Sequence, residues 1–191
     1  MVMTAKRFAQ PYTETELEVE TYLNQTTPGL AIPATDGITS GAGVIYRSGI
    51  FRSGGLIHTE ILLDLTGLSS ATTVLDIIGL GANPAHLGQI TTVQNGIILA
   101  GLMTCLEAPL SLVDLDLYGA VEATGVFEAL VTDLDELALL TRGATWALGD
   151  AIAFTAIPRP GDYLYLVNGI ADTADPFTTG KFLIELFGYD A

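Results

Sequence analysis

Short runs of strand-forming residues recur along most of the chain, and this pattern limits its fold more than any other feature. The runs follow Ala42 and are separated by glycine, proline and clusters of Asp, Asn and Ser. Such spacing is typical of all-β sandwiches and barrels, whose short strands are joined by turns. We expect strands at residues 44–51, 56–65, 74–78, 97–106, 112–118, 163–167 and 181–189, and weaker ones at 90–93 and 152–157.

The alternation within residues 56–65 predicts which side chains enter the core, because successive side chains of a strand point to opposite faces. We expect Ile57, Thr59, Ile61, Leu63 and Leu65 to face inward, and His58, Glu60, Leu62 and Asp64 to face outward. Leu62 is apolar on the outward face, which suggests an interface there.

Residues 112–118 show the same alternation with two acids on the outward face. Leu115 and Leu117 share the inner face with Val113, while Asp114 and Asp116 lie opposite, as in a half-buried antiparallel strand. These two acids could share a hard cation with Asp172 or Asp175. The loop lacks the rest of a calcium motif, which favours solvated turn residues over a cation site.

One segment departs from the strand pattern. Its apolar residues recur at roughly helical spacing, at Phe127, Leu130, Val131, Leu134 and Ala138. Thr132 and Asp135 resemble a capping box. We therefore predict one short helix at residues 133–140, ended by Arg142 and Gly143.

The first 41 residues differ in composition from the rest and predict an extended N-terminal arm and linker. Four glutamates occupy alternate positions from residue 14 to 20, followed by Pro28, Pro33 and a loop around Gly37. The chain is thus expected to divide into an arm and linker at 1–41 and a β domain at 42–191.

The arm is expected to bind a basic partner outside its own domain. As a strand it places Glu14, Glu16, Glu18, Glu20 and Tyr22 on one face, and Leu17, Val19 and Leu23 on the other. An extended segment can add to the edge of a neighbouring sheet, with its backbone supplying affinity and its side chains supplying register. The arm is therefore a candidate partner-binding segment.

Composition and charge narrow the class of partner. The formal charge of −15 is the wrong sign for phosphate backbones, so nucleic acid is not expected. No membrane span or signal peptide is expected, and we predict assembly in a cytoplasm. Hydrophobic residues make up 49% and charged residues 15% of the chain, which favours an oligomer.

Motifs for catalysis or cofactor binding are sparse, and we expect neither an enzyme nor a bound cofactor or metal. The chain has no phosphate-binding glycine loop and no nucleophile elbow. His58 and Glu60 share a strand face, which favours a solvated face with a mild ion pair over metal ligation. His86 is expected in a hydrogen-bonding loop, and Cys105, the only cysteine, in the core.

Arg47 and Arg52 are the remaining candidates for partner binding. They lie five positions apart around Gly49, where they could pair with acids of a neighbouring subunit. Alternatively, their aliphatic portions lie along the sheet surface with the charged groups in solvent.

Much of the chain resembles small structural proteins of tailed bacteriophages, of the capsid decoration or cement kind, that are encoded among the head genes. The resemblance is carried by IYRSG at 45–49, IHTEILLDLTGL at 57–68, HLGQI at 86–90, MTCLE at 103–107, DLY at 116–118, GDYLYL at 161–166 and GKFLIELFGY at 180–189. The arm lies outside these segments, so its role rests on physical argument alone.

The resemblance implies a jelly-roll-like homotrimer on the outer capsid surface that ties neighbouring major capsid subunits together. It implies virion localisation, and no cofactor or reaction. A receptor- or carbohydrate-binding module of a head or tail fibre is the alternative, because jelly rolls often bind sugars. Sugar platforms usually display aromatic side chains, and Trp146 is the only tryptophan.

Overall fold

The computed structural model describes residues 31–110, 114–171 and 175–190 and has an all-β fold. Two antiparallel sheets contain the strands, and two α-helices of four residues lie in the connections. The elements are α3 (Asp36–Thr39), β1 (Ile45–Ser53), β2 (Leu56–Asp64), α4 (Thr92–Asn95), β3 (Ile97–Glu107), β4 (Leu115–Ala120), the 3-10 helix η1 (Val131–Leu134), β5 (Glu136–Leu140), β6 (Ala151–Ala153), β7 (Tyr163–Asn168) and β8 (Lys181–Tyr189). The all-β prediction is confirmed, whereas the jelly-roll likeness stays a prediction.

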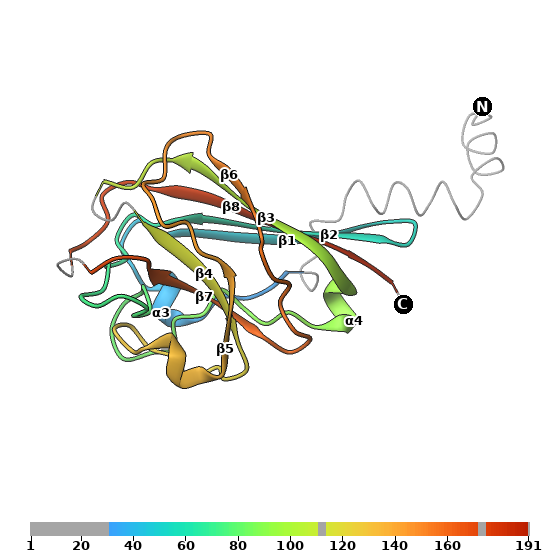
Figure 1. Cartoon of the computed structure of the whole chain (residues 1–191), viewed down its shortest axis with the longest axis horizontal. Helices are drawn as coiled ribbons and strands as arrows, with labels where there is room; N and C mark the ends of the chain where they lie inside the picture. The colour runs from blue at the N-terminus through green and yellow to red at the C-terminus, as the bar shows by residue number, and fades with distance from the viewer. Residues whose placement is uncertain (1–30, 111–113, 172–174, 191) are drawn as a thin grey trace, which may run out of the picture.

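The sheets form two layers around one core (Figure 1). The larger sheet has the strand order β1-β2-β8-β3-β6, and the smaller has the order β5-β4-β7. Strand β8, near the C-terminus, lies between β2 and β3, so the sheet depends on pairing between distant parts of the chain. The turn of the β1–β2 hairpin extends beyond the smaller sheet (Figure 1).

The predicted alternation in β2 is confirmed except at Asp64, which is buried at 6% exposed and lies opposite Lys181. Ile57, Ile61 and Leu63 are buried, while His58 and Glu60 are half-buried on the opposite face. Burial of each such branched side chain stabilises the fold by about 1.5–3 kcal/mol. The inner face of the large sheet therefore supplies much of the core.

The central strand of the smaller sheet, β4, is covered on both faces, which overturns the predicted exposure of Asp114 and Asp116. Every residue of β4 is buried, and the two acids are 4% and 5% exposed. Asp116 accepts a hydrogen bond from the backbone N–H of Arg142 (2.7 Å), in the loop after β5. This loop covers the face that strand alternation alone assigns to solvent.

The predicted helix at residues 133–140 is wrong. The segment forms the short η1 and then β5, which pairs with β4. Asp135 separates them with a left-handed backbone (φ 51°, ψ 63°), which ends η1 and turns the chain into the strand. Pairing with β4 outweighs the helical spacing of the apolar residues.

Two shorter strand predictions are also wrong, and a third is too long. Residues 74–78 make only isolated bridges, and residues 90–93 lead into α4. In the segment at 152–157, only the first positions belong to β6, which is Ala151–Ala153. Asp76 and Ile77 each make a single bridge, to Leu130 and Val167, rather than a continuous ladder.

Residues 31–41 belong to the packed body rather than to a linker. Ile32 and Ile38 are fully buried, and Ser48 Oγ hydrogen-bonds both the N–H (2.9 Å) and the carbonyl oxygen (2.7 Å) of Ile32. The packed body therefore includes residues 31–41, which were expected to lie in a linker. The Glu row and Leu17, Val19, Tyr22 and Leu23 lie outside the described residues.

Candidate interaction surface

The outer face of the five-stranded sheet displays large apolar side chains to solvent. We call this the outer face, and its exposed apolar residues are Ile45, Phe51, Leu56, Ile97, Leu99, Leu106, Phe187 and Tyr189. Leu56 and Leu99 are the most open, at 64% and 56% exposed. Most of these residues gather near the hairpin end of the sheet, whereas Ile45 and Leu106 lie at its other end beside the charged row of Asp64, Lys181 and Glu107. A cluster of exposed apolar side chains marks interaction sites on proteins.

Strand register makes these side chains neighbours rather than scattered contacts. Leu56 lies opposite Tyr189, which in turn lies opposite Ile97, so one apolar row crosses β2, β8 and β3. The next row contains Phe51, His58 and Phe187. His58 stacks on Phe187 with ring centroids 4.7 Å apart and planes 8° apart. Two adjacent rows therefore form one patch near the hairpin end of the sheet.

The free edge of β1 adjoins this patch. Within the described residues, β1 pairs with β2 on one side and with no strand on the other. A nine-residue edge whose backbone groups bond to no other described strand is a template for another chain. The edge and the outer face together suit a partner that adds a strand and covers apolar side chains.

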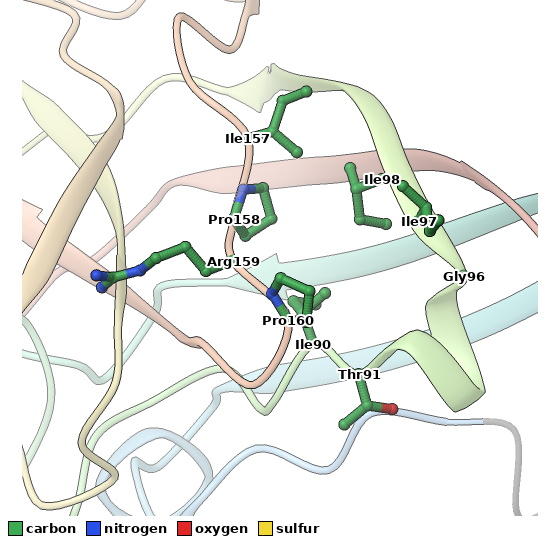
Figure 2. Close-up of a pocket in the computed structure, with 9 residues that line it drawn as sticks. All are labelled: Ile90, Thr91, Gly96, Ile97, Ile98, Ile157, Pro158, Arg159 and Pro160. Carbon is green, nitrogen blue, oxygen red and sulfur yellow. The ribbon is translucent and has the colours of Figure 1, made fainter. Parts of the chain in front are cut away.

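A shallow apolar pocket of about 330 Å³ lies where β3 begins. Figure 2 shows Ile98 extending towards the loop of Pro158 and Pro160, with Ile90 below, while the side chain of Arg159 points away; Ile97 also lines the pocket. Arg159 instead binds Asp162 (3.1 Å) and Asp135 (3.3 Å). Because Ile97 also belongs to the outer face, the pocket extends that surface around the end of the sheet.

The two arginines expected to bind a partner have different environments. Arg47 is exposed on β1 beside Leu62, where it remains a candidate for partner binding. Arg52 is engaged within its own chain, since it binds the Asp190 carboxylate at 2.6 Å and the carbonyl oxygens of Val93 (2.9 Å) and Gln94 (3.2 Å). Arg52 therefore ties β1 to α4 and the C-terminal residues, rather than presenting a free guanidinium.

One group of potential metal ligands interrupts the apolar surface. His58, Glu60 and Glu185 offer ligand atoms that all lie within 4.8 Å of one another. His58 Nδ1 is 3.5 Å from Glu60 Oε1, and His58 Nε2 is 3.2 Å from Glu185 Oε1. The sequence analysis identified His58 and Glu60 as neighbours on one strand face, and the pairing of β2 with β8 places Glu185 beside them.

His86 occupies the hydrogen-bonding loop position that the sequence favoured. Its Nδ1 accepts a hydrogen bond from the N–H of Gly88 (3.1 Å), and its ring packs on Tyr163 and Tyr165. Burial lowers the pKa of His86 to about 4. The ring is therefore neutral near pH 7 and acts in packing and loop geometry.

Asp116 is expected to make stability depend on pH. Burial raises its pKa from 3.8 to about 6, and the nearby Asp114 carboxylate adds to the shift. Between pH 4 and pH 6 the folded state therefore keeps a proton on Asp116 that the unfolded state has already released. This contribution to stability is present below pH 4 and is lost as the pH rises through 6.

Asp116→Asn should remove this dependence while its side-chain oxygen can still accept the Arg142 N–H hydrogen bond. The variant should be more stable than wild type at pH 7.5, by on the order of 2 kcal/mol, with the difference shrinking towards pH 4. Urea unfolding at several pH values measures it. A stability difference independent of pH would contradict the assignment.

The sequence of residues 181–189 indicates that the outer face is covered by another chain or segment, because this strand is apolar on both faces. Residues 181–189 are apolar at inner positions such as Ile184 and also at outer positions such as Leu183 and Phe187. A run that is apolar on both faces is typical of a strand covered on both sides. Leu62, which the sequence flagged, is half-buried within this surface.

Comparisons with protein-family models, with curated proteins and with solved structures found no match to this chain. Among the helices in the described part of the chain, none has the length and apolar character needed to cross a membrane. A functional proposal must therefore rest on the surfaces described above and on the resemblance noted from the sequence.

Proposed function

We propose that this protein is a virion structural protein that decorates the outside of a phage capsid and stabilises contacts between neighbouring major capsid subunits. The open apolar outer face, with the free β1 edge beside it, is the observation that carries the proposal. The inner face of the same sheet and both faces of β4, the central strand of the smaller sheet, are covered by the chain itself. Other chains of an assembly would cover the remaining face.

The charge of the chain supports an assembly role of this kind. With a formal charge of −15, copies repel one another in solution unless specific surfaces bring them together. Binding through an apolar face and a strand edge is less sensitive to this repulsion than binding through scattered charges. A lattice also multiplies modest affinities, because each bound subunit meets several neighbours. A homotrimer fits this arrangement.

The N-terminal arm is proposed as a second contact. Its Glu row would face a basic strip on a capsid subunit, while Leu17, Val19 and Leu23 would cover an apolar one. Each exposed ion pair contributes about 0–1 kcal/mol, so the arm depends on many contacts together. The body and the arm would then bind separately and reinforce each other.

Cosedimentation with empty capsids tests both parts of the proposal. Full-length protein is mixed with DNA-free capsids assembled from the major capsid protein of the same phage. We expect saturable binding and greater resistance of the shells to heat. Removal of residues 1–28 should weaken binding at least tenfold while leaving Ile32 and the folded body in place.

The outcomes separate the two parts. Absence of binding by the full-length protein would contradict the decoration proposal. Equal binding and protection by the truncated protein would contradict the role of the arm, while leaving the outer face as the site of contact.

A further inference from the structure

We propose that His58, Glu60 and Glu185 form a binding site for Zn²⁺ or a chemically similar divalent transition metal on the outer face of the large sheet. The inference does not depend on the capsid proposal. It rests on the register of two central strands, on the charges of the cluster and on the spacing of its ligand atoms.

Strand register brings the three side chains together. His58 and Glu60 are two residues apart on β2, so they share a face, and Glu60 lies directly opposite Glu185 on β8. Both strands are interior to the five-stranded sheet, with β1 and β3 on their outer sides. Metal sites bind well when their ligands project from such rigid elements.

The ring of His58 is held in place by aromatic neighbours. It stacks on Phe187, and Phe51 lies against it at a tilt, with centroids 6.2 Å apart. These contacts restrict rotation of the ring within the cluster. A restricted imidazole loses less conformational freedom when it binds a metal.

The two carboxylates lack a permanent positive partner. Among the described residues, the recorded ion pairs of Glu60 and Glu185 are with His58 alone. Their flanking neighbours in the sheet are Gly49 and Leu102, which carry no charge. Like charges directly opposite each other on a sheet are destabilising, and a bound cation would relieve that cost.

A second acidic row on the same sheet shows the contrast. There, Lys181 of β8 lies between Asp64 and Glu107, and its Nζ is 3.3 Å and 2.6 Å from their carboxylate oxygens. The protein thus supplies its own cation to one acid pair. In the row of Glu60 and Glu185, the position that corresponds to the lysine is itself an acid.

The ligand atoms lie close together, but His58 turns a different ring nitrogen to each carboxylate, so a metal would need one carboxylate to move. Two ligands about 2.0–2.1 Å from a tetrahedral zinc ion lie about 3.3 Å apart. The His58 nitrogens are 3.5 Å and 3.2 Å from Glu60 Oε1 and Glu185 Oε1. The metal would take one ring nitrogen, and the carboxylate now paired with the other nitrogen would rotate to reach it. Glu60, whose side chain is 41% exposed, has room for this movement.

The ligand set also selects the class of ion. Imidazole with carboxylates suits Zn²⁺ and Co²⁺, whereas Mg²⁺ and Ca²⁺ prefer oxygen ligands alone. Three protein ligands leave at least one coordination position open towards solvent. Water would fill it in the isolated protein.

Titration of the full-length, chelator-treated protein with ZnCl₂ by calorimetry tests the proposal. We expect one saturable site with a dissociation constant in the micromolar range or tighter, above any weak binding to the many surface acids. His58→Asn and Glu185→Gln should each weaken this site at least tenfold. Glu107→Gln, from the neutralised row on the same sheet, should leave it unchanged.

A second readout uses CoCl₂, whose visible absorption intensifies when the ion leaves octahedral water for a four-coordinate site. Wild type and Glu107→Gln should show this band, and His58→Asn should not. Thermal unfolding with chelator present verifies that each variant is folded. Failure of wild type to bind zinc saturably, or equal binding by wild type, His58→Asn and Glu185→Gln, would overturn the proposal.

Discussion

Replacement of Trp146 with alanine should lower the free energy of unfolding by about 3–5 kcal/mol. Trp146 is 1% exposed and meets the ring of Phe182 edge-on, with centroids 5.2 Å apart. Its Nε1 donates a hydrogen bond to the carbonyl oxygen of Leu115 (2.9 Å), on β4. The indole therefore joins the loop after β5 to strands of both sheets, and its loss leaves a cavity between them.

Chemical denaturation with guanidinium measures the effect, and Trp146→Phe is the matched control. The control keeps an aromatic ring against Phe182 but loses the hydrogen bond, so it should cost less than the alanine variant. A loss below about 1 kcal/mol for Trp146→Ala would show that this side chain does not link the sheets as described.

Capsid binding should fall by more than about 100-fold when Leu56 and Leu99 of the outer face are both replaced with aspartate. Each leucine contributes about 1.5–3 kcal/mol when it is fully buried in an interface, and each aspartate would place a charge there. Both side chains are more than half exposed in the free protein, so folding should be little affected. Cosedimentation across a concentration series measures the change in affinity.

The matched control places two aspartates on apolar residues away from the large sheet. Val74 and Val121 are 41% and 49% exposed, in the loop before Leu75 and directly after β4. The Val74→Asp/Val121→Asp variant adds the same charge and should bind as wild type does. Equal loss in both double variants would indicate general charge repulsion rather than a defined docking face.

Apolar runs bounded by turn residues predicted the strands of the large sheet well. Runs at 44–51, 56–65, 97–106 and 181–189 correspond closely to β1, β2, β3 and β8. The exposure of residues in the smaller sheet was predicted incorrectly, because Asp114 and Asp116 are covered by the loop that contains Arg142. No local pattern shows which segments will cover a strand.

The candidate surface could be predicted only in part for a similar reason. The run at 181–189 indicated a strand covered on both faces, but the covering chain could have been its own. His58 and Glu60 are neighbours on one strand and were identified as such. Glu185 joins them through pairing between segments more than 100 positions apart, which sequence spacing does not reveal. Arg52 was predicted to bind a partner subunit. Its own partner, Asp190, lies 138 positions later, and sequence spacing does not reveal such a pair either.

A cryo-electron microscopy reconstruction of capsids saturated with the full-length protein tests the central claim most directly. We predict density for the protein on the outer capsid surface, with Leu56, Leu99 and Phe187 of the outer face covered by neighbouring subunits. A reconstruction in which these side chains face solvent, while the smaller sheet and its loops contact the shell, would contradict the account. So would capsids that carry no density for the protein.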